Sequence, residues 1–155
     1  MYKTVVFDLD GTLLNTLTDL ADAGNRLCRK YSWPTHERQA YRYFVGNGIP
    51  KLVERLAPAD QRTPAVLEAA LADFKRDYGQ HLRDTTAPYP GIPEMLAKLK
   101  ANGVQLAVFS NKADALAKEV VKDYFGTQYF TIVRGQMTGV APKPAAEGTN
   151  ALLQA

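Results

Sequence analysis

Two aspartates, Asp8 and Asp10, stand directly after residues 3–7. These residues are rich in β-branched and apolar side chains, which predicts a buried strand that ends in a polar turn. Residues two apart in an extended chain project to the same side, so both carboxylates can face one crevice. Gly11 permits a tight turn after them, and Thr12 can hold that turn by local hydrogen bonds. A lone aspartate here would usually be only a turn former. A pair directly after a strand instead predicts nucleophilic or acid–base chemistry at the strand's carboxyl end.

A second polar segment stands where another apolar run ends. Val104–Phe109 predicts a buried strand, and Ser110, Asn111 and Lys112 follow it at once. A hydroxyl group combined with backbone N–H groups at the start of the next helix is a natural seat for a phosphate group. An ordinary helix cap is the alternative. Because this segment ends a strand as Asp8 does, we favour phosphate binding.

The rest of the chain supplies the elements that would position these residues. Apolar residues recur at steps of three and four through residues 16–84, which predicts a block of helices. After a linker rich in proline and glycine, residues 94–102 and 113–125 follow the helical pattern, and residues 130–133 read as a third strand. Alternating strands and helices predict a parallel sheet, with the helical block inserted after its first strand.

The first motif carries a resemblance to a known family. Phe7–Leu13 matches in full the first motif of the haloacid dehalogenase superfamily, in its phosphoglycolate-phosphatase-like branch with an inserted helical cap. The resemblance covers essentially the whole chain. It implies an α/β fold with a three-layer, Rossmann-like parallel sheet core formed by residues 1–15 and 85–155. Residues 16–84 would then be the helical cap domain.

The resemblance also implies a role for each aspartate. Asp8 would be the nucleophile, attacking phosphorus in line with the leaving oxygen to form an aspartyl-phosphate. Asp10 would protonate the leaving alcohol and then take a proton from the attacking water. One carboxyl group must start charged and the other protonated, so we expect their surroundings to differ.

Further site residues follow from the other motifs. Ser110 and Asn111 resemble the second motif, so we expect them to bind the substrate together with Thr12. Lys143, which stands between two prolines after the third strand, resembles the third motif, a lysine that offsets charge on the nucleophile and on the phosphoryl group. A lysine in a loop is otherwise usually only solvated. Its position after a strand favours the catalytic interpretation.

Magnesium is the cofactor that the resemblance implies, with Asp8 and the backbone carbonyl of Asp10 as ligands. The family's fourth motif should add acidic residues at the end of a further strand. After Lys143 the only carboxylate side chain is that of Glu147, and residues 145–155 read as a helix. We therefore expect the chain to stop before this motif, which leaves the core incomplete on its C-terminal side and the binding of magnesium weak.

An incomplete core has a predicted consequence for the sheet. In this family the strand that carries the first motif lies centrally, between the strands of the second and fourth motifs. We therefore expect the strand order three, two, one, with the strand before Asp8 at an open edge. An apolar edge with unpaired N–H and C=O groups favours self-association or pairing with another chain.

A loop in the predicted cap interrupts the helical pattern at Gly46 and Asn47. It resembles the cap loop that faces the active site in this branch, so both residues are candidates for substrate binding. An ordinary turn between helices is the alternative. Arg42, Lys51 and Arg55 lie nearby in the sequence and could meet a carboxylate of the substrate.

Composition narrows the class of partner. The formal net charge of +3 comes from interspersed lysines and arginines, which disfavours nucleic acid and membrane surfaces as partners and suits a small phosphorylated metabolite. The apolar runs are far shorter than the roughly 20 residues of a membrane span. Cys28 is the single cysteine and follows a helical pattern, so we expect packing and a reducing compartment. These features predict a cytoplasmic location.

The function predicted from the resemblance is hydrolysis of a small phosphate monoester by a magnesium-dependent phosphatase. The leading substrate is 2-phosphoglycolate, which rests on the family branch alone. A phosphosugar mutase of the same superfamily is the nearest alternative, because it uses the same two aspartates. A truncated, non-catalytic fragment on the same fold is the alternative from another class. A dehalogenase is disfavoured, since that branch lacks the second aspartate, present here as Asp10.

Overall fold

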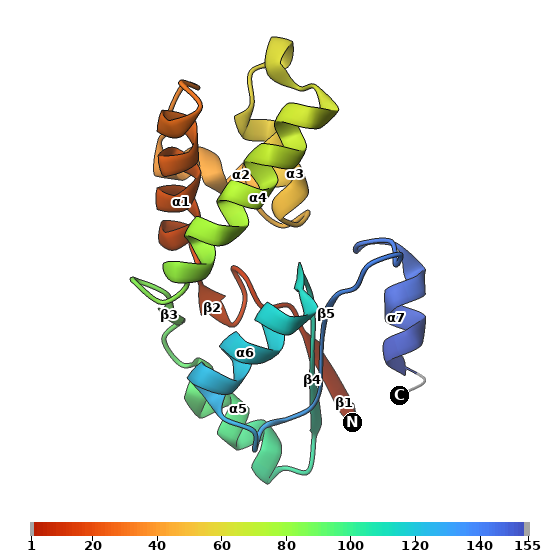
Figure 1. The fold of residues 1–155 in the computed structure, drawn as a ribbon. Coiled ribbons are helices and arrows are strands. Elements are labelled where there is room, and N and C mark those ends of the chain that lie inside the picture. The colour runs from red at the N-terminus through yellow and green to blue at the C-terminus, as the bar shows by residue number, and fades with distance from the viewer. Residues whose placement is uncertain (1, 154–155) are drawn as a thin grey trace. The chain divides into compact units, whose positions relative to one another are not determined.

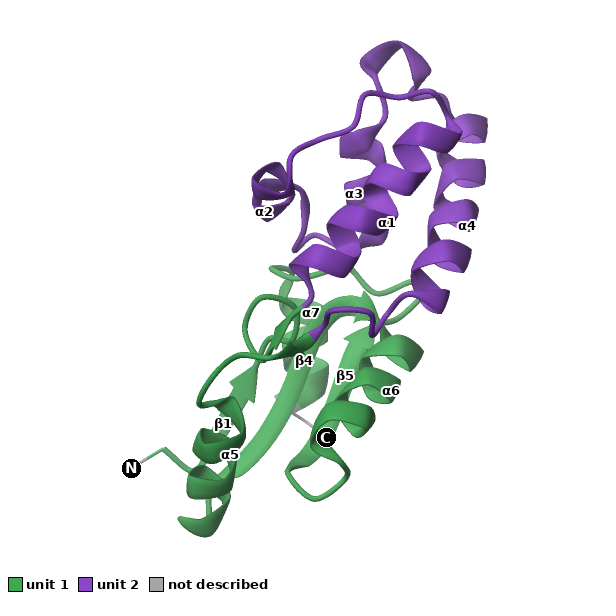
Figure 2. Cartoon of the chain, turned by 90° about the vertical axis from the view of Figure 1, so that its left-hand side faces the viewer, with its two compact units in different colours: residues 1–15, 87–155 green, residues 16–86 purple. Residues whose placement is uncertain are grey.

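The computed structural model describes residues 2–153, whose helices and strands are labelled in Figure 1. The chain divides into two compact units, shown in Figure 2. The core unit comprises residues 1–15 and 87–155, and the helical unit comprises residues 16–86. The chain therefore returns to the core unit two residues later than the expected boundary after residue 84.

The core unit is built on a parallel sheet. Its strands are β1 (Thr4–Phe7), β4 (Gln105–Ala113) and β5 (Phe130–Gln136), in the order β1-β4-β5. Both neighbouring pairs are parallel, so the expected α/β class is confirmed. The order of the strands in the sheet is also the expected one, with β1 at an edge. Val6 of the edge strand is 42% exposed, and self-association through this edge stays a prediction.

Helices cover both faces of this sheet, which makes three layers. The helices α5 (Ile92–Ala101) and α6 (Asp114–Phe125) lie on one side of the sheet, and α7 (Ala146–Leu153) lies on the other (Figure 1). On the α7 side, the backbone of Gly148 lies close to the ring of Phe109, where an added Cβ would be 2.5 Å from a ring carbon. This small residue therefore lets α7 approach β4.

The apolar core of this unit explains why β4 is central. All residues of β4 between its two ends are buried, and two of them, Leu106 and Val108, pack in one cluster with leucines from the turn after β1 and apolar side chains of α5 and α6. Leu9, Leu96, Leu106 and Val108 are fully buried. Each contributes about 1.5–3 kcal/mol by removal from water, so this cluster anchors the carboxyl ends of the strands.

The helical unit contains four α-helices and two short 3₁₀ turns between Thr16 and Thr86. Their bounds are α1 (Leu17–Lys30), η1 (Arg38–Ala40), α2 (Tyr41–Phe44), α3 (Ile49–Leu56), η2 (Ala59–Gln61) and α4 (Pro64–Gln80). The expected block of helices is therefore present. The segment α4 packs against both α1 and α3, and its residues Phe74 and Tyr78 are buried there.

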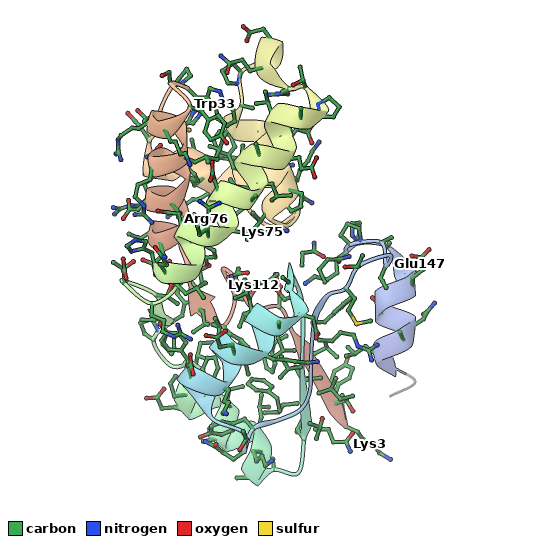
Figure 3. The ribbon with its side chains drawn as sticks, in the orientation of Figure 1. Lys3, Trp33, Lys75, Arg76, Lys112 and Glu147 are labelled. Atoms are coloured by element: carbon green, nitrogen blue, oxygen red, sulfur yellow. The ribbon has the colours of Figure 1, made fainter. Side chains whose placement is uncertain are left out.

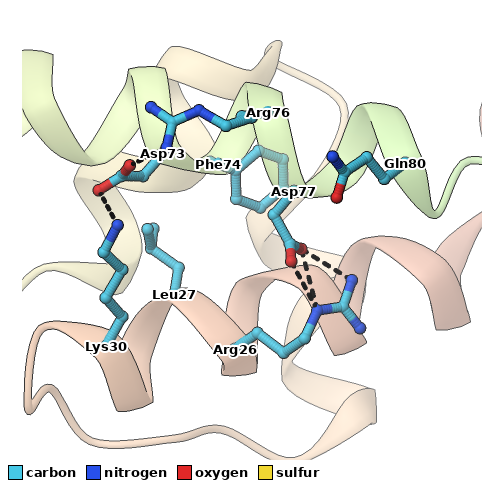
Figure 4. A pocket seen from close by; sticks show the side chains of 8 residues that line it. All are labelled: Arg26, Leu27, Lys30, Asp73, Phe74, Arg76, Asp77 and Gln80. Atoms are coloured by element: carbon cyan, nitrogen blue, oxygen red, sulfur yellow. Dashed lines mark hydrogen bonds and ion pairs between the residues drawn. The ribbon is translucent and has the colours of Figure 1, made fainter.

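Ion pairs reinforce the packing of α1 on α4 around a surface pocket of about 240 Å³ (Figure 4). Arg26 donates from Nε and Nη2 to the carboxylate of Asp77, with distances of 2.7–3.0 Å. Lys30 lies 2.7 Å from Asp73 at the other end of the pocket. The charges that line this pocket are paired with one another, which favours a structural role for them.

Both chain crossings between the units are tied by contacts that the sequence pattern did not reveal. In the core unit, β2 (Leu14–Asn15) pairs antiparallel with β3 (Ala87–Pro88). In the helical unit, the buried carboxylate of Asp19 accepts hydrogen bonds from the backbone N–H and the hydroxyl groups of both Thr85 and Thr86. The start of α1 is thereby fixed to the end of the same unit.

Two smaller sequence predictions concern location and the cysteine. No helix within residues 2–153 is long and apolar enough to cross a membrane.

Cys28 is buried in α1 without a disulfide partner, and burial raises the pKa of its thiol to about 11. The thiol is therefore protonated at neutral pH, in agreement with a packing role. The cytoplasmic location stays a prediction.

Candidate active site

The turn after β1 presents Asp8 and Asp10 at the carboxyl end of the strand. Leu9 is fully buried between them, and its carbonyl oxygen accepts hydrogen bonds from the N–H groups of Leu13 and Leu14 at 3.0 and 3.1 Å. Gly11 has a φ of +81°, a left-handed conformation that a residue with a Cβ would adopt only with strain. The buried leucine and the glycine thus leave the two carboxylates on the outside of a tight turn.

Lys143 lies beside Asp8, although 135 residues separate them in the chain. Its Nζ donates to Asp8 Oδ1 at 2.8 Å and to the carbonyl oxygen of Phe109 at 2.6 Å. The N–H of Leu9 donates to the same Oδ1 at 2.8 Å. Half of the Asp8 carboxylate is therefore anchored, and the side chain as a whole is 44% exposed.

Asp10 is paired with a different lysine, Lys112, for which the sequence indicated no role. The Nζ atom of Lys112 lies 3.0 and 3.3 Å from the two carboxylate oxygens of Asp10. The lysine side chain is 3% exposed and that of Asp10 is 19% exposed, so this pair is far less solvated than the pair at Asp8. A buried ammonium needs such a partner because its desolvation is costly. The one feature of the sequence that could have pointed to Lys112 is its position directly after Ser110 and Asn111.

Asn111 contacts the loop that carries Lys143. Its Oδ1 accepts from the N–H of Lys143 at 2.8 Å, and its Nδ2 donates to the carbonyl oxygen of Lys143 at 3.2 Å. These two bonds hold the backbone of Lys143 on both sides. The amide of Asn111 thus holds the backbone of the lysine that lies beside Asp8, and substrate binding by Asn111 stays a prediction.

Ser110 is buried and its Oγ accepts from the N–H of Lys112 at 3.1 Å. The expected end of the strand at Phe109 was too early, since β4 continues to Ala113. Its pairing with β5 becomes irregular between Phe109 and Ala113, which turns Ser110, Asn111 and Lys112 out of the regular ladder. Such an irregularity re-aims side chains towards a site.

The first residue of α6 is an aspartate that is bound by two neighbouring groups. The helix begins at Asp114, and this carboxylate accepts from the N–H of Gly135 at 2.9 Å and from Lys118 at 2.7 Å. Burial opposes ionisation of Asp114, but these two hydrogen bonds outweigh it and lower its pKa. Asp114 therefore places a negative charge in the first turn of α6, and phosphate binding at this helix end stays a prediction. Ser110 and the exposed Thr12 remain candidates for phosphate binding.

The cap candidates lie in the helical unit, in the loop between α2 and α3. Asn47 is exposed, and its Oδ1 accepts from Arg55 at 3.0 Å. Arg55 also donates to the carbonyl oxygen of Phe44 at 2.8 Å, so it stabilises the loop. Lys51 is paired with Glu54 at 2.7 Å, while Arg42 is exposed. The predicted substrate contacts of Gly46 and Asn47 stay predictions.

The charges at the site balance, with two carboxylates facing two ammonium groups. A phosphate monoester would add a dianion beside Asp8, so a cation would favour its binding. Residues 2–153 contain no group of three or more His, Cys, Asp or Glu side chains placed to hold a metal. Magnesium, however, commonly binds through one or two carboxylates, substrate phosphates and waters, which fits the carboxylate of Asp8 and the carbonyl of Asp10.

Comparison with known proteins agrees with this geometry. Residues 5–155 match the family model described as haloacid dehalogenase-like hydrolase. A phosphoglycolate phosphatase of Thiobacillus denitrificans is 32% identical over 145 residues, which cover 92% of this chain and 64% of that protein. One of Neisseria meningitidis is 34% identical over 146 residues, covering 92% of this chain and 62% of that protein. The chain thus spans less than two thirds of the length of these relatives.

Solved structures share the fold. The crystal structure of a predicted phosphoglycolate phosphatase from Haemophilus somnus superposes with a TM-score of 0.86 at 26% identity, covering 99% of this chain and 71% of that one. Protein Tyrosine Kinase A of Mycobacterium tuberculosis superposes with a TM-score of 0.82 at 23% identity, covering 99% and 69%. The second likeness shows a shared fold alone, so the function has to be argued from the site.

Proposed function

Because this chain belongs to the haloacid dehalogenase-like hydrolase family, we propose that its protein hydrolyses small phosphate monoesters at Asp8. The observation that carries the proposal is the position of Lys143, whose Nζ lies 2.8 Å from Asp8 Oδ1 at the carboxyl end of β1. A cation beside an exposed carboxylate can offset the charge that would otherwise repel a phosphate group. The relatives named phosphoglycolate phosphatase support the same class of reaction.

The proposed reaction begins with attack by Asp8. Lys143 and the N–H of Leu9 both bind Oδ1, so we assign the attack on phosphorus to Oδ2. The new bond from Oδ2 to phosphorus forms as the bond from phosphorus to the alcohol oxygen breaks. Asp10 gives that oxygen its proton, so its carboxylate must first take up a proton when the phosphate dianion binds beside it. Water then attacks the aspartyl-phosphate and passes a proton to Asp10, which releases inorganic phosphate and restores both carboxyl groups.

Magnesium belongs to the proposal as the source of the missing positive charge. The carboxylate of Asp8 and the backbone carbonyl of Asp10 would hold it, and the ion would neutralise charge on the phosphoryl oxygens. Calcium accepts more ligands at longer distances, so we expect calcium to suppress turnover. Full turnover in excess chelator would contradict this part of the proposal.

The substrate that we propose is 2-phosphoglycolate, because both relatives described above carry that name. The test compares release of inorganic phosphate from 2-phosphoglycolate by the full product of the gene with release from other small phosphate monoesters. Release without any added sugar bisphosphate excludes the mutase alternative. No release from any monoester in the presence of magnesium would favour the non-catalytic alternative.

Asp8→Asn tests the nucleophile, because an amide cannot form the aspartyl-phosphate. We expect no measurable phosphate release and an unchanged far-ultraviolet circular dichroism spectrum. Asp10→Asn should lower kcat by about a hundredfold or more, the usual effect of a positioned proton donor. The matched control is Asp60→Asn, at an exposed position of the helical unit. Activity of Asp8→Asn within tenfold of the wild type would end the assignment.

A further inference from the structure

Lys112 is a buried cation with no role in the reaction proposed above. Its side chain is 3% exposed, at the carboxyl end of β4 beside the first turn of α6 (Figure 3). Removing an ammonium group from water costs several kcal/mol unless a well-placed anion compensates. Asp10 is such an anion, since both its carboxylate oxygens lie within 3.3 Å of Nζ. A lysine buried at a reactive carboxylate calls for a functional explanation.

The backbone around Lys112 is held in place on both sides. Its N–H donates to Ser110 Oγ at 3.1 Å, within the irregular end of β4. Its carbonyl oxygen lies against Gly135 of β5, where an added Cβ would come within 2.4 Å. Gly135 in turn donates its N–H to Asp114, the residue that begins α6. The side chain of Lys112 therefore extends towards Asp10 from a fixed base.

Asp10 itself has less support from its own backbone. It precedes Gly11, whose left-handed conformation turns the chain away directly after the carboxylate. The carboxylate of Asp8, by contrast, is bound by the N–H of the next residue, Leu9. Lys112, which belongs to β4, binds the carboxylate of Asp10, and its Nζ contacts both oxygens.

We propose that Lys112 is a positioning residue of the reaction. It holds the Asp10 carboxylate in the orientation that takes a proton from the water attacking the aspartyl-phosphate. This role rests on the proposed function. It predicts that loss of Lys112 slows the breakdown of the aspartyl-phosphate more than its formation, because formation from a substrate with a good leaving group needs no proton from Asp10.

The experiment uses p-nitrophenyl phosphate, the full product of the gene, and rapid mixing to separate formation from breakdown. In Lys112→Met we expect steady-state turnover to fall by about tenfold to a hundredfold, the usual effect of a misplaced catalytic group. The initial burst of p-nitrophenol should persist, and intact-mass measurement should show phosphorylated protein accumulating. Lys118→Met, which removes an exposed lysine of α6, is the matched control and should behave as the wild type.

A double-mutant cycle separates positioning from a general loss of structure. With Asp10→Asn already present, adding Lys112→Met should change turnover less than twofold, because the lysine would act only through Asp10. Lys112→Gln, which can still donate to one oxygen of Asp10, should fall between the wild type and Lys112→Met. It also keeps the test valid if the apolar variant does not fold, as thermal unfolding would show.

Two results would overturn the role in different ways. Equal slowing of the burst and of the steady state in Lys112→Gln, or further slowing in the double variant, would reject positioning while leaving the phosphatase intact. If the wild type releases no phosphate from any monoester, the proposed function fails and the role of Lys112 fails with it.

Discussion

The two units of this protein use ion pairs in different ways. In the helical unit, Arg26 and Asp77 join two helices that already pack through apolar faces, and their side chains are 34% and 33% exposed. In the core unit, Lys112 and Asp10 are 3% and 19% exposed and join segments 102 residues apart. The first pair lies on a packed interface, whereas the second holds a carboxylate at the end of a strand.

This difference indicates what each pair contributes. Exposed pairs are screened by water and contribute about 0–1 kcal/mol each to stability. A buried pair gains little net stability because desolvation offsets the attraction between its charges. A role in the proposed reaction therefore explains the buried pair at Asp10 better than a contribution to folding does. The comparison predicts that Lys112 and Lys143 affect turnover, while charges in the helical unit affect stability or nothing measurable.

Among the residues of these ion pairs for which this comparison makes a prediction, the largest expected effect is at Lys143, which pairs with Asp8. Lys143→Met should lower kcat/KM by roughly a hundredfold to a thousandfold, as loss of one charged group facing a developing negative charge usually does. The melting temperature should change little, because the Lys143 and Asp8 side chains are 25% and 44% exposed. Enzyme kinetics and calorimetry on the same samples check this. A large loss of stability with intact turnover would break the comparison.

The next effect is on stability and lies in the helical unit. Asp19→Ala removes the acceptor of hydrogen bonds from Thr85 and Thr86, and leaves the buried donors of Thr86 without it. We expect a loss of about 3 kcal/mol in the free energy of unfolding, measured with urea. Asp22→Ala, an exposed position on the same helix, is the control and should lose less than about 0.5 kcal/mol. Equal losses in the two variants would show that the hydrogen bonds of Asp19 with Thr85 and Thr86 do not stabilise the helical unit.

The smallest effect is expected at the partly exposed pair of Arg26 and Asp77, shown in Figure 4. Asp77→Asn removes the charge that faces Arg26 but keeps a similar shape, so the free energy of unfolding should fall by about 0.2–1 kcal/mol. Turnover should match the wild type. The loss should shrink further in 1 M salt, where the Debye length is about 3 Å. A stability loss as large as that of Asp19→Ala would show that exposure does not distinguish the two kinds of pair.

The sequence by itself predicted most of the helices and strands and the position of Asp8 and Asp10 at the end of a strand. Steps of three and four predicted α4 and α6, and the apolar run before Asp8 predicted β1, because periodicity is a local property of the chain. The spacing of Asp8 and Asp10 was enough to place both at one strand end. Assigning Lys143 a role already required resemblance to a family, since a lysine between prolines has no pattern of its own.

Tertiary structure decided which charge meets which. The register that pairs Phe7 with Val108 brings the turn after β1 beside the irregular end of β4. Lys112 thereby reaches Asp10, and Asn111 reaches the backbone of Lys143. The contact of Asp19 with Thr85 likewise spans 66 positions. Local patterns predict strands and helices. Contacts between residues so far apart in the chain depend on how those elements pack, and a local pattern carries no information about packing.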